Sequence, residues 1–458
     1  MVADVTRQSV LFPDLFNKRL VAKFDQEHGS SDGGAVLLAA CDRRLQLTER
    51  LAGCIEDRRE PGKVRHAIQE IVRQRVFGIA CGYADGNDAA RLADDPVHKL
   101  LVGREALSGD SLASQPTLSR FENAVDRKAQ YRMGEALAQS VVERHRKRLG
   151  RKVKRITIDL DPTDDPTHGA QQLTFFNAHY DCWCYLPLAG FVSFNDEPEQ
   201  YLFTYLLRAG NAPATRGTIG VLRRVLKRLR EAFPRARIRV RLDGGFATPE
   251  IFEFLERQRC EYVVAMAKNA VLKRHAAQLM EEARQLSEAS GQTEHVYGEC
   301  QYKAGQWKSE RRTIIKAEVV CLAGRQPKDN PRFVITNLKT SPRWIYEQVY
   351  CERGDVENRI KELHHGLEID RTSCTDFWAN QLRVLMTAAA YVLMQELRLR
   401  AARTSCARAQ VSTLRERLLK LGAWIETSVR RIVLHLPESF AYRSEWQRIA
   451  RSVGAVPT

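Results

Sequence analysis

The order of strands and helices expected between residues 155 and 267 constrains the fold of this chain more than any other feature. RITIDLD, residues 155–161, alternates apolar and polar side chains with a period of two, which is the pattern of a strand. Further strands are expected at 183–193, 200–207, 236–245 and 261–267, and helices at 217–232 and from Thr248 or Pro249 onward. The resulting order, β-β-β-α-β-α-β, predicts an α/β fold in which helices cover a mixed sheet.

Helical periodicity dominates the residues before this segment. Apolar residues recur at helical spacing in 35–51, 66–79 and 130–149. A short helix is expected to begin near Ser114, with Pro116 in its first turn. The polar and basic side chains at this start suit phosphate contacts, as in a helix-turn-helix, and a plain capped helix is equally compatible with them.

The charge of the chain is unevenly distributed. The formal net charge is +16, from 72 Lys and Arg against 56 Asp and Glu. Residues 216–241, which include the helix expected at 217–232, carry ten basic residues and one acid, and residues 381–458 carry 13 basic and 5 acidic residues. A polyanion is the expected partner, with nucleic acid first, and a solvated basic surface is the alternative.

Membrane insertion and export are not expected. The longest uncharged apolar stretch near the C-terminus, residues 384–394, has 11 residues, whereas a spanning helix needs about 20. The N-terminal 15 residues contain Asp4 and no apolar core of signal-peptide length. The 11 cysteines follow no regular spacing and include no CxxC, which indicates a reduced, cytoplasmic set.

Two aspartates stand at the ends of expected strands. Asp161 closes the first strand, and Asp243 closes the fourth strand before a pair of glycines. Open α/β sheets place their sites at such strand ends, although an aspartate there is also a common turn former. Asp159 shares a strand face with Asp161, so either of these two acids could reach a common site.

A helix near residue 355 supplies a third acid. Tyr350, Arg353, Glu357 and His364 follow one another at spacings of three, four and seven residues. On a regular helix these side chains fall within roughly 60° of one another, beside an apolar stripe. The alternative is a solvated charged face.

These features together resemble the DDE transposases of bacterial insertion sequences, of the group-one DDE branch. The resemblance rests on IDLDPTDDPTHG, on LDGGF, and on the helix pattern Tyr–x2–Arg–x3–Glu–x6–Lys, which here has His364 at its last position. The stretches SSDGGAVLL, LTERLAGCIEDRREP, GYADGNDAARLADDP and SQPTLSRFENA are similar to those of one branch of these enzymes. The resemblance covers nearly the whole chain and implies an RNase H-like catalytic core.

The resemblance implies a catalytic metal site. Asp161, Asp243 and Glu357 would hold two Mg²⁺ or Mn²⁺ ions, because hard carboxylate oxygens suit these ions. Two such ions can activate the attacking oxygen and stabilise the leaving oxygen of an in-line displacement. Asp161 is preferred to Asp159 as first ligand because the Asp–x–Thr of residues 161–163 is closer to the family pattern.

The resemblance also implies DNA contacts. Arg353 would bind a phosphate near the cut, and Tyr350 would pack beside it. His364 stands where the family has Lys, so the phosphate contact at this position falls to an imidazole or to a nearby residue (Arg359, Lys361 or His365). In the segment before this helix, Phe333 is the first candidate and Trp307 the second for stacking on an unpaired base, with ordinary packing as the alternative.

The predicted organisation follows from these assignments. Five regions are expected: an N-terminal helical DNA-binding region (1–150), a first part of the core (151–269), a β-rich insertion (270–341), a second part of the core with the Glu357 helix (342–400) and a basic helical tail (401–458). The predicted function is transposition in the bacterial cytoplasm, on nucleoid DNA: binding terminal inverted repeats, cutting the ends and joining them to target DNA. A homodimer is expected to hold two ends.

Two alternatives remain open at this point. A catalytically silent regulator derived from a transposase would bind DNA without cutting it. A metal-dependent nuclease with the same fold would cut DNA without joining it. Metal-dependent cleavage separates the first alternative from the predicted function, and a strand-transfer product separates the second.

Overall fold

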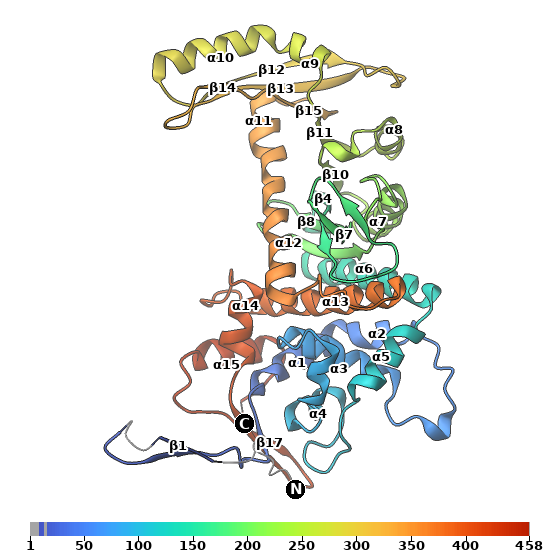
Figure 1. Cartoon of the computed structure of the whole chain (residues 1–458), viewed down its shortest axis with the longest axis vertical. Helices are drawn as coiled ribbons and strands as arrows, with labels where there is room; N and C mark the ends of the chain where they lie inside the picture. The colour runs from blue at the N-terminus through green and yellow to red at the C-terminus, as the bar shows by residue number, and fades with distance from the viewer. Residues whose placement is uncertain (1–8, 13–15, 458) are drawn as a thin grey trace.

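The computed structural model describes residues 9–12 and 16–457 (Figure 1). Residues 1–15, in which no export signal is expected, lie mostly outside this described part. The molecule is elongated: a long twisted sheet runs from one end to the middle, α13 (Phe377–Arg400) crosses beneath it, and the helices of residues 36–124 lie beyond α13 (Figure 1). The mixed α/β class expected from the sequence is confirmed.

From its outer edge at β9, the sheet begins with five strands in the order β9-β8-β4-β10-β11. Here β4 (Arg155–Pro162), β10 (Arg237–Leu242) and β11 (Glu261–Met266) are parallel. By contrast, β8 (Leu188–Phe194) is antiparallel to β4 and to β9 (Tyr201–Leu206). β4 is buried along nearly its whole length because helices cover both faces of the sheet.

The helices that follow these strands bury one apolar stripe each. α7 (Thr218–Ala232) buries the apolar side chains Val221, Leu222, Val225, Leu226 and Leu229, and its other face is mostly basic. α8 (Pro249–Arg257) is the shorter equivalent before β11. Figure 1 shows α7 and α8 on one side of the sheet and α12 (Gly354–Leu367) on the other.

The segment expected as a β-rich insertion continues the same sheet. β15 (Arg332–Thr336) pairs antiparallel with β11, β13 (Arg311–Val320) with β15, and β12 (Glu294–Tyr302) with β13. The two-residue strand β14 (Lys328–Asp329) pairs with β13. Helices α9 (Ala270–His275) and α10 (Ala277–Ser290) precede these strands, and α10 lies along β12 and β13 (Figure 1).

The N-terminal region is mainly helical, as its periodicity predicted. Its helices are α1 (Val36–Leu45), α2 (Leu47–Ala52), α3 (Ile68–Ala80), α4 (Pro96–Val102), α5 (Gln115–Ala124) and α6 (Arg127–Leu149). Ser114 precedes α5, and Pro116 lies in its first turn, as expected. β1 (Val10–Phe12) and β2 (Leu20–Ala22) form a separate antiparallel pair.

The C-terminal tail differs from the expected helical structure. Between α14 (Val411–Leu414) and α15 (Arg443–Ser452) it forms a hairpin of β16 (Ala423–Thr427) and β17 (Ile432–His435). β16 also pairs with β3 (Gly29–Ser30), about 400 residues away in sequence, so local periodicity could not reveal this sheet. Close packing completes the junction, because a Cβ on Gly34 would overlap the backbone carbonyl of Leu418.

Long apolar helices of this chain are buried in protein. Most side chains of α13 are buried against α3, α6 and β9, which explains its apolar composition. Within residues 9–12 and 16–457, no helix has both the length and the hydrophobicity needed to span a bilayer.

Three short strands, β5 (Asp165–Pro166), β6 (Phe175–Asn177) and β7 (Cys182–Tyr185), form a small additional sheet.

A buried histidine between α6 and the sheet predicts a pH effect on stability. The ring of His145 is 2% exposed and stacks on Phe194, with centroids 4.8 Å apart. Burial, assisted by the nearby charge of Arg148, lowers the pKa of His145 well below its ordinary value. The unfolded chain therefore binds a proton below pH ~6.5 that the folded chain does not, so stability is lost as the pH falls through that value.

The expected contribution is about 1.4 kcal/mol per pH unit below that point. We expect the apparent urea midpoint of the wild type to fall more steeply between pH 7.5 and 5.5 than that of His145→Phe. The exposed His365 supplies the control, since His365→Gln should keep the wild-type slope. Equal slopes in all three proteins would contradict the assignment of a neutral, buried imidazole.

Candidate catalytic site

The register of two neighbouring parallel strands brings Asp161 and Asp243 together. Asp159 of β4 lies opposite Arg241 of β10, so Asp161 and Asp243, two residues further along, leave the sheet at the same edge. One guanidinium nitrogen, Nη2 of Arg353, lies 2.6 Å from Asp161 Oδ1 and 3.8 Å from Asp243 Oδ2. The two acids thus share a cation, whereas the sequence had suggested only a DNA phosphate as the partner of Arg353.

Asp161 is the more buried of these two acids. It is 7% exposed, whereas the side chain of Asp243 is 29% exposed and accepts a hydrogen bond from Gly245 N at 2.8 Å. Burial raises the pKa of Asp161 to about 7; Arg353 opposes this shift, and the neighbouring acids, Asp243 and Glu357 before others, add to it. Burial is thus the main cause of the shift, and the neighbouring acids are a smaller one.

Asp159 is engaged elsewhere. Both of its oxygens accept hydrogen bonds from Arg241, at 2.7 Å from Nε and 2.9 Å from Nη2, and the carboxylate is fully buried. Such a bidentate pair leaves no oxygen directed at the strand end. Of the two acids that the sequence left as alternatives, only Asp161 faces Asp243 and Arg353.

Glu357 approaches the same edge from α12. It lies in the first turn of that helix with an exposed side chain, and its charge contributes to the raised pKa of Asp161. The three acids are not drawn together around one point. In the described part of the chain, the only three acidic, Cys or His residues with ligand atoms mutually within 4.8 Å are Asp32, Cys81 and His98.

The helical segment that carries Tyr350, Arg353 and Glu357 is irregular, which the sequence did not predict. α11 (Pro342–Ile345) passes into a π-helical turn (Tyr346–Tyr350) and then a 3₁₀ turn (Cys351–Arg353) before α12 begins. Tyr350 is half-buried against Tyr346, with ring centroids 5.4 Å apart. Arg353, the last residue of the 3₁₀ turn, reaches Asp161 just after this change of helix type.

His364 lies against the end of β4. Its Nδ1 is 3.1 Å from Asp370 Oδ2, and its Nε2 is 3.5 Å from Thr163 Oγ1. The imidazole is therefore held by neighbours within the protein. Among the alternatives considered for the phosphate contact, Arg359 pairs with Glu199 and Glu362, whereas Lys361 is exposed and has no ion-pair partner among the described residues.

The expectation for Phe333 is wrong. Phe333 lies in β15 at 2% exposure, and the second candidate, Trp307, is 4% exposed and packs on Phe252 with centroids 5.0 Å apart. Both rings belong to the hydrophobic core and present no face to a base. The segment RFVITNL forms β15, which pairs with β11 and β13 and so continues the main sheet. The Phe333 ring therefore packs into the core of this sheet. In a separate insertion, as the sequence suggested, the ring would not have had to lie in this core.

Comparison of the sequence with known protein families identifies the family of the chain. Residues 12–458 match the profile of the family described as transposase DDE domain, group 1. The chain belongs to this family. No curated protein sequence matches the chain. Its relatives in the family use divalent metal ions for nuclease and transposition chemistry, and the three acids predicted as ligands lie within the matched residues.

Two buried residues of this DDE transposase fix the Glu357 helix and were missed in the sequence. Arg241 bonds the carbonyl oxygen of Val349 at 3.0 Å, in addition to its pair with Asp159. Glu362 of α12 accepts hydrogen bonds from Tyr391 Oη at 2.8 Å and Val411 N at 2.7 Å and forms an ion pair with Arg398. A sequence signal for Arg241 was present. Asp159 lies two residues before Asp161, and Arg241 lies two residues before Asp243, so adjacent strands that end at the two later aspartates set Arg241 opposite Asp159.

The Asp32, Cys81 and His98 cluster of the transposase lies in its N-terminal region. Asp32 is fully buried; its Oδ2 is 2.9 Å from His98 Nε2, and its Oδ1 is 2.8 Å from Lys420 Nζ. Burial raises the pKa of the Cys81 thiol, which disfavours the thiolate that a metal needs. Since Lys420 already neutralises the carboxylate, we assign this cluster to the attachment of the C-terminal segment.

Proposed function

We propose that this transposase binds the terminal inverted repeats of its element, cuts the DNA at those ends and joins them to target DNA. The observation that carries the proposal is the pair of aspartates that end adjacent parallel strands and share one guanidinium, with Glu357 on the neighbouring helix. The strand order β9-β8-β4-β10-β11, with only the first two joins antiparallel, supports an RNase H-like core.

The donor set fits two Mg²⁺ or Mn²⁺ ions. Asp161, Asp243 and Glu357 offer only hard oxygen ligands, and Arg353 is the one cation paired with the two aspartates among the described residues. When bound, the ions would polarise the scissile phosphate and stabilise charge on the attacking and leaving oxygens. The same displacement serves water attacking a DNA strand and a 3′-hydroxyl attacking the target.

The surrounding side chains would orient the DNA. In the proposal, Arg353 leaves the aspartates and forms a bidentate contact with a phosphate beside the cut, for which its planar guanidinium is suited. Lys361, one turn after Glu357 and exposed, supplies the positive charge that His364 lacks. Tyr350 packs against the same DNA strand. The cytoplasm would be the site of action, and a homodimer would hold two ends.

The test is an assay of a labelled DNA fragment that carries the end of the element, with Mg²⁺ and a supercoiled target plasmid. Cleavage at the element boundary followed by insertion of the labelled end into the plasmid would support the proposal. Cleavage without a joined product would identify a nuclease instead. Binding without cleavage in either Mg²⁺ or Mn²⁺ would identify a silent DNA-binding regulator.

The place of Arg353 predicts how the DNA-free protein binds metal. An ion at Asp161 and Asp243 must displace the guanidinium, so Arg353→Gln is expected to raise the Mn²⁺ affinity by about 10-fold, the equivalent of one lost charged hydrogen bond. Isothermal titration without DNA measures this. Arg343→Gln, which removes an exposed pair with Glu347 from the same helical segment, should leave the affinity unchanged. Lower Mn²⁺ affinity in Arg353→Gln would contradict the competition.

A further inference from the structure

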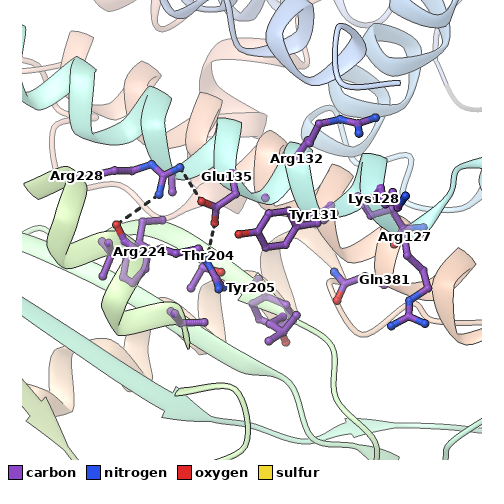
Figure 2. Close-up of a pocket in the computed structure, with 18 of the residues that line it drawn as sticks. Arg127, Lys128, Tyr131, Arg132, Glu135, Thr204, Tyr205, Arg224, Arg228 and Gln381 are labelled. Carbon is purple, nitrogen blue, oxygen red and sulfur yellow. Dashed lines mark hydrogen bonds and ion pairs between the residues drawn. The ribbon is translucent and has the colours of Figure 1, made fainter. Parts of the chain in front are cut away.

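A groove of about 740 Å³ lies outside the catalytic site, between α6, β9, α7 and α13 (Figure 2). Its floor is apolar and includes Phe203, Leu206, Val221, Val225 and Leu385. The strand residues that line it, 203–206, are consecutive, so the groove runs along the outer edge of the sheet and not over one face. This volume is within the range of ligand-binding clefts.

Basic side chains surround this apolar floor. Arg127, Lys128 and Arg132 of α6 and Arg224 and Arg228 of α7 line the groove, against a single acid, Glu135. Glu135 pairs with Arg224 at 2.8 Å and with Arg228 at 2.6 Å, which holds both guanidinium groups at the rim (Figure 2). Further cations continue along the exposed face of α7, so the surface is complementary to a polyanion.

Two aromatic rings complete the groove. Tyr131 is 55% exposed although it lines the cavity, and Figure 2 shows its ring projecting from α6 across the groove. The Trp378 ring lies beneath the guanidinium of Arg127, 4.5 Å from its Cζ to the ring centroid. Aromatic rings interleaved with cations form the usual surface for an unpaired nucleic-acid strand, where bases stack and phosphates pair with basic groups.

The groove lies close to the catalytic edge of the sheet. Tyr205, in its floor, is paired with Ala189 of β8, which is paired with Asp161 of β4. The backbones of Tyr205 and Asp161 are therefore two strand spacings apart, or about 10 Å. A DNA strand that leads away from the cut could enter the groove over this distance.

We propose that this groove binds an unpaired segment of DNA strand, with a base stacked on Tyr131 and phosphates bound by the basic residues of α6 and α7. A duplex would leave the ring and the apolar floor unused, because its base faces are already stacked. Since the ligand is DNA, the inference rests on the proposed function. The basic helix α7, which contributes no residue to the catalytic site, would then bind DNA phosphates.

The experiment measures fluorescence anisotropy of a labelled oligo-dT 12-mer with the full-length protein in EDTA, so that cleavage does not contribute. Tyr131→Ala is expected to weaken binding by about 5- to 100-fold, as for the loss of one stacked base. Tyr131→Phe keeps the ring and should bind like wild type. Arg127→Gln with Lys128→Gln should weaken binding and reduce the salt slope by about 1.4, or 0.7 per phosphate contact.

A second measurement locates the strand directly. The same oligonucleotide with 5-iodouracil is photocrosslinked to the wild type, and the modified peptide is identified by mass spectrometry. Adducts within residues 127–138 or at Trp378 are the expected result. Adducts confined to other regions, or a Tyr131→Ala affinity within two-fold of wild type, would overturn the proposal.

Other occupants and other failures give distinct results. If the groove instead holds a second copy of the chain, Tyr131→Ala will change the sedimentation coefficient and leave oligonucleotide binding intact, which overturns the proposal. Equal loss of duplex and single-strand binding in the Arg127→Gln, Lys128→Gln double variant, with no loss in Tyr131→Ala, also overturns it. End cleavage is measured separately in Mg²⁺. If the wild type cleaves the end and Tyr131→Ala binds the oligonucleotide like wild type, only the proposal for the groove is contradicted. If binding depends on Tyr131 and no cleavage occurs, only the proposed function is contradicted.

Discussion

Asp243→Asn and Glu357→Gln are each expected to lower Mg²⁺-dependent cleavage of the element end by at least about 10³-fold, since the bound ions supply several kcal/mol of transition-state stabilisation. Both substitutions preserve shape and remove one negative oxygen ligand. Neither side chain is fully buried, so the fold should tolerate both changes. Single-turnover cleavage of the labelled end, with protein in excess, measures the effect.

The matched control for these variants lies on the same helix. Asp355 is exposed two residues before Glu357 and forms no ion pair among the described residues, so Asp355→Asn should cleave within a few-fold of wild type. Binding of the end fragment in EDTA should be similar in all four proteins, because DNA affinity depends mainly on phosphate contacts. Retained cleavage in Asp243→Asn would remove Asp243 from the metal site.

The strand and helix order of the central sheet could be predicted because it depends on local periodicity. RITIDLD and the later strands show their period of two within a few residues, and the helix at 217–232 shows its apolar stripe. The β3, β16 and β17 sheet joins segments from opposite ends of the chain, and no local pattern reports such pairing. The same limit made the strands before Phe333 look like a separate insertion, although they extend the central sheet.

The candidate site was predictable to the level of residue types at strand ends, but not to the level of contacts. Asp161 and Asp243 were identified because strand ends are favoured site positions, and the structure places both beside Arg353. The strand periodicity alone could not distinguish Asp159 from Asp161, although the family pattern favoured Asp161, since the distinction depends on the register that sets Arg241 opposite Asp159. The π-helical turn before Arg353 was invisible for the same reason, because it arises from packing and not from composition.

Asp159→Asn is expected to destabilise the protein strongly, by about 3–5 kcal/mol, because it removes the buried counterion of the Arg241 guanidinium and leaves only the exposed Glu352. Arg241 is 3% exposed, and Asp159 is fully buried. The melting temperature should fall by about 3–5 °C, since about 1 kcal/mol shifts it by about 1 °C in a chain of this size. Differential scanning fluorimetry in EDTA measures it without any contribution from bound metal.

An apolar replacement of the pair separates stability from positioning. Asp159→Leu combined with Arg241→Met should recover much of the lost stability, as buried ion pairs often can be replaced by packed apolar groups. It should not recover the contacts of Arg241 with the carbonyl of Val349 and with Glu352, which attach the turns before α12 to β10. We therefore expect the double variant to melt near the wild type and yet cleave at least about 10-fold more slowly, since small misplacements of catalytic groups are costly.

Hydrogen exchange distinguishes this positioning role from a general loosening of the fold. Amides in 346–356 should exchange faster in the double variant, while those of β4 and β10 stay protected. The bidentate pair of Arg311 with Glu256, at 2.7 and 3.0 Å, provides the control because it joins β13 to α8 and does not contact the helix of Glu357. Glu256→Gln should lower the melting temperature without changing exchange in 346–356. If exchange and cleavage in the double variant match the wild type, Arg241 stabilises the core alone, and the Glu357 helix is positioned by Glu362 and its partners.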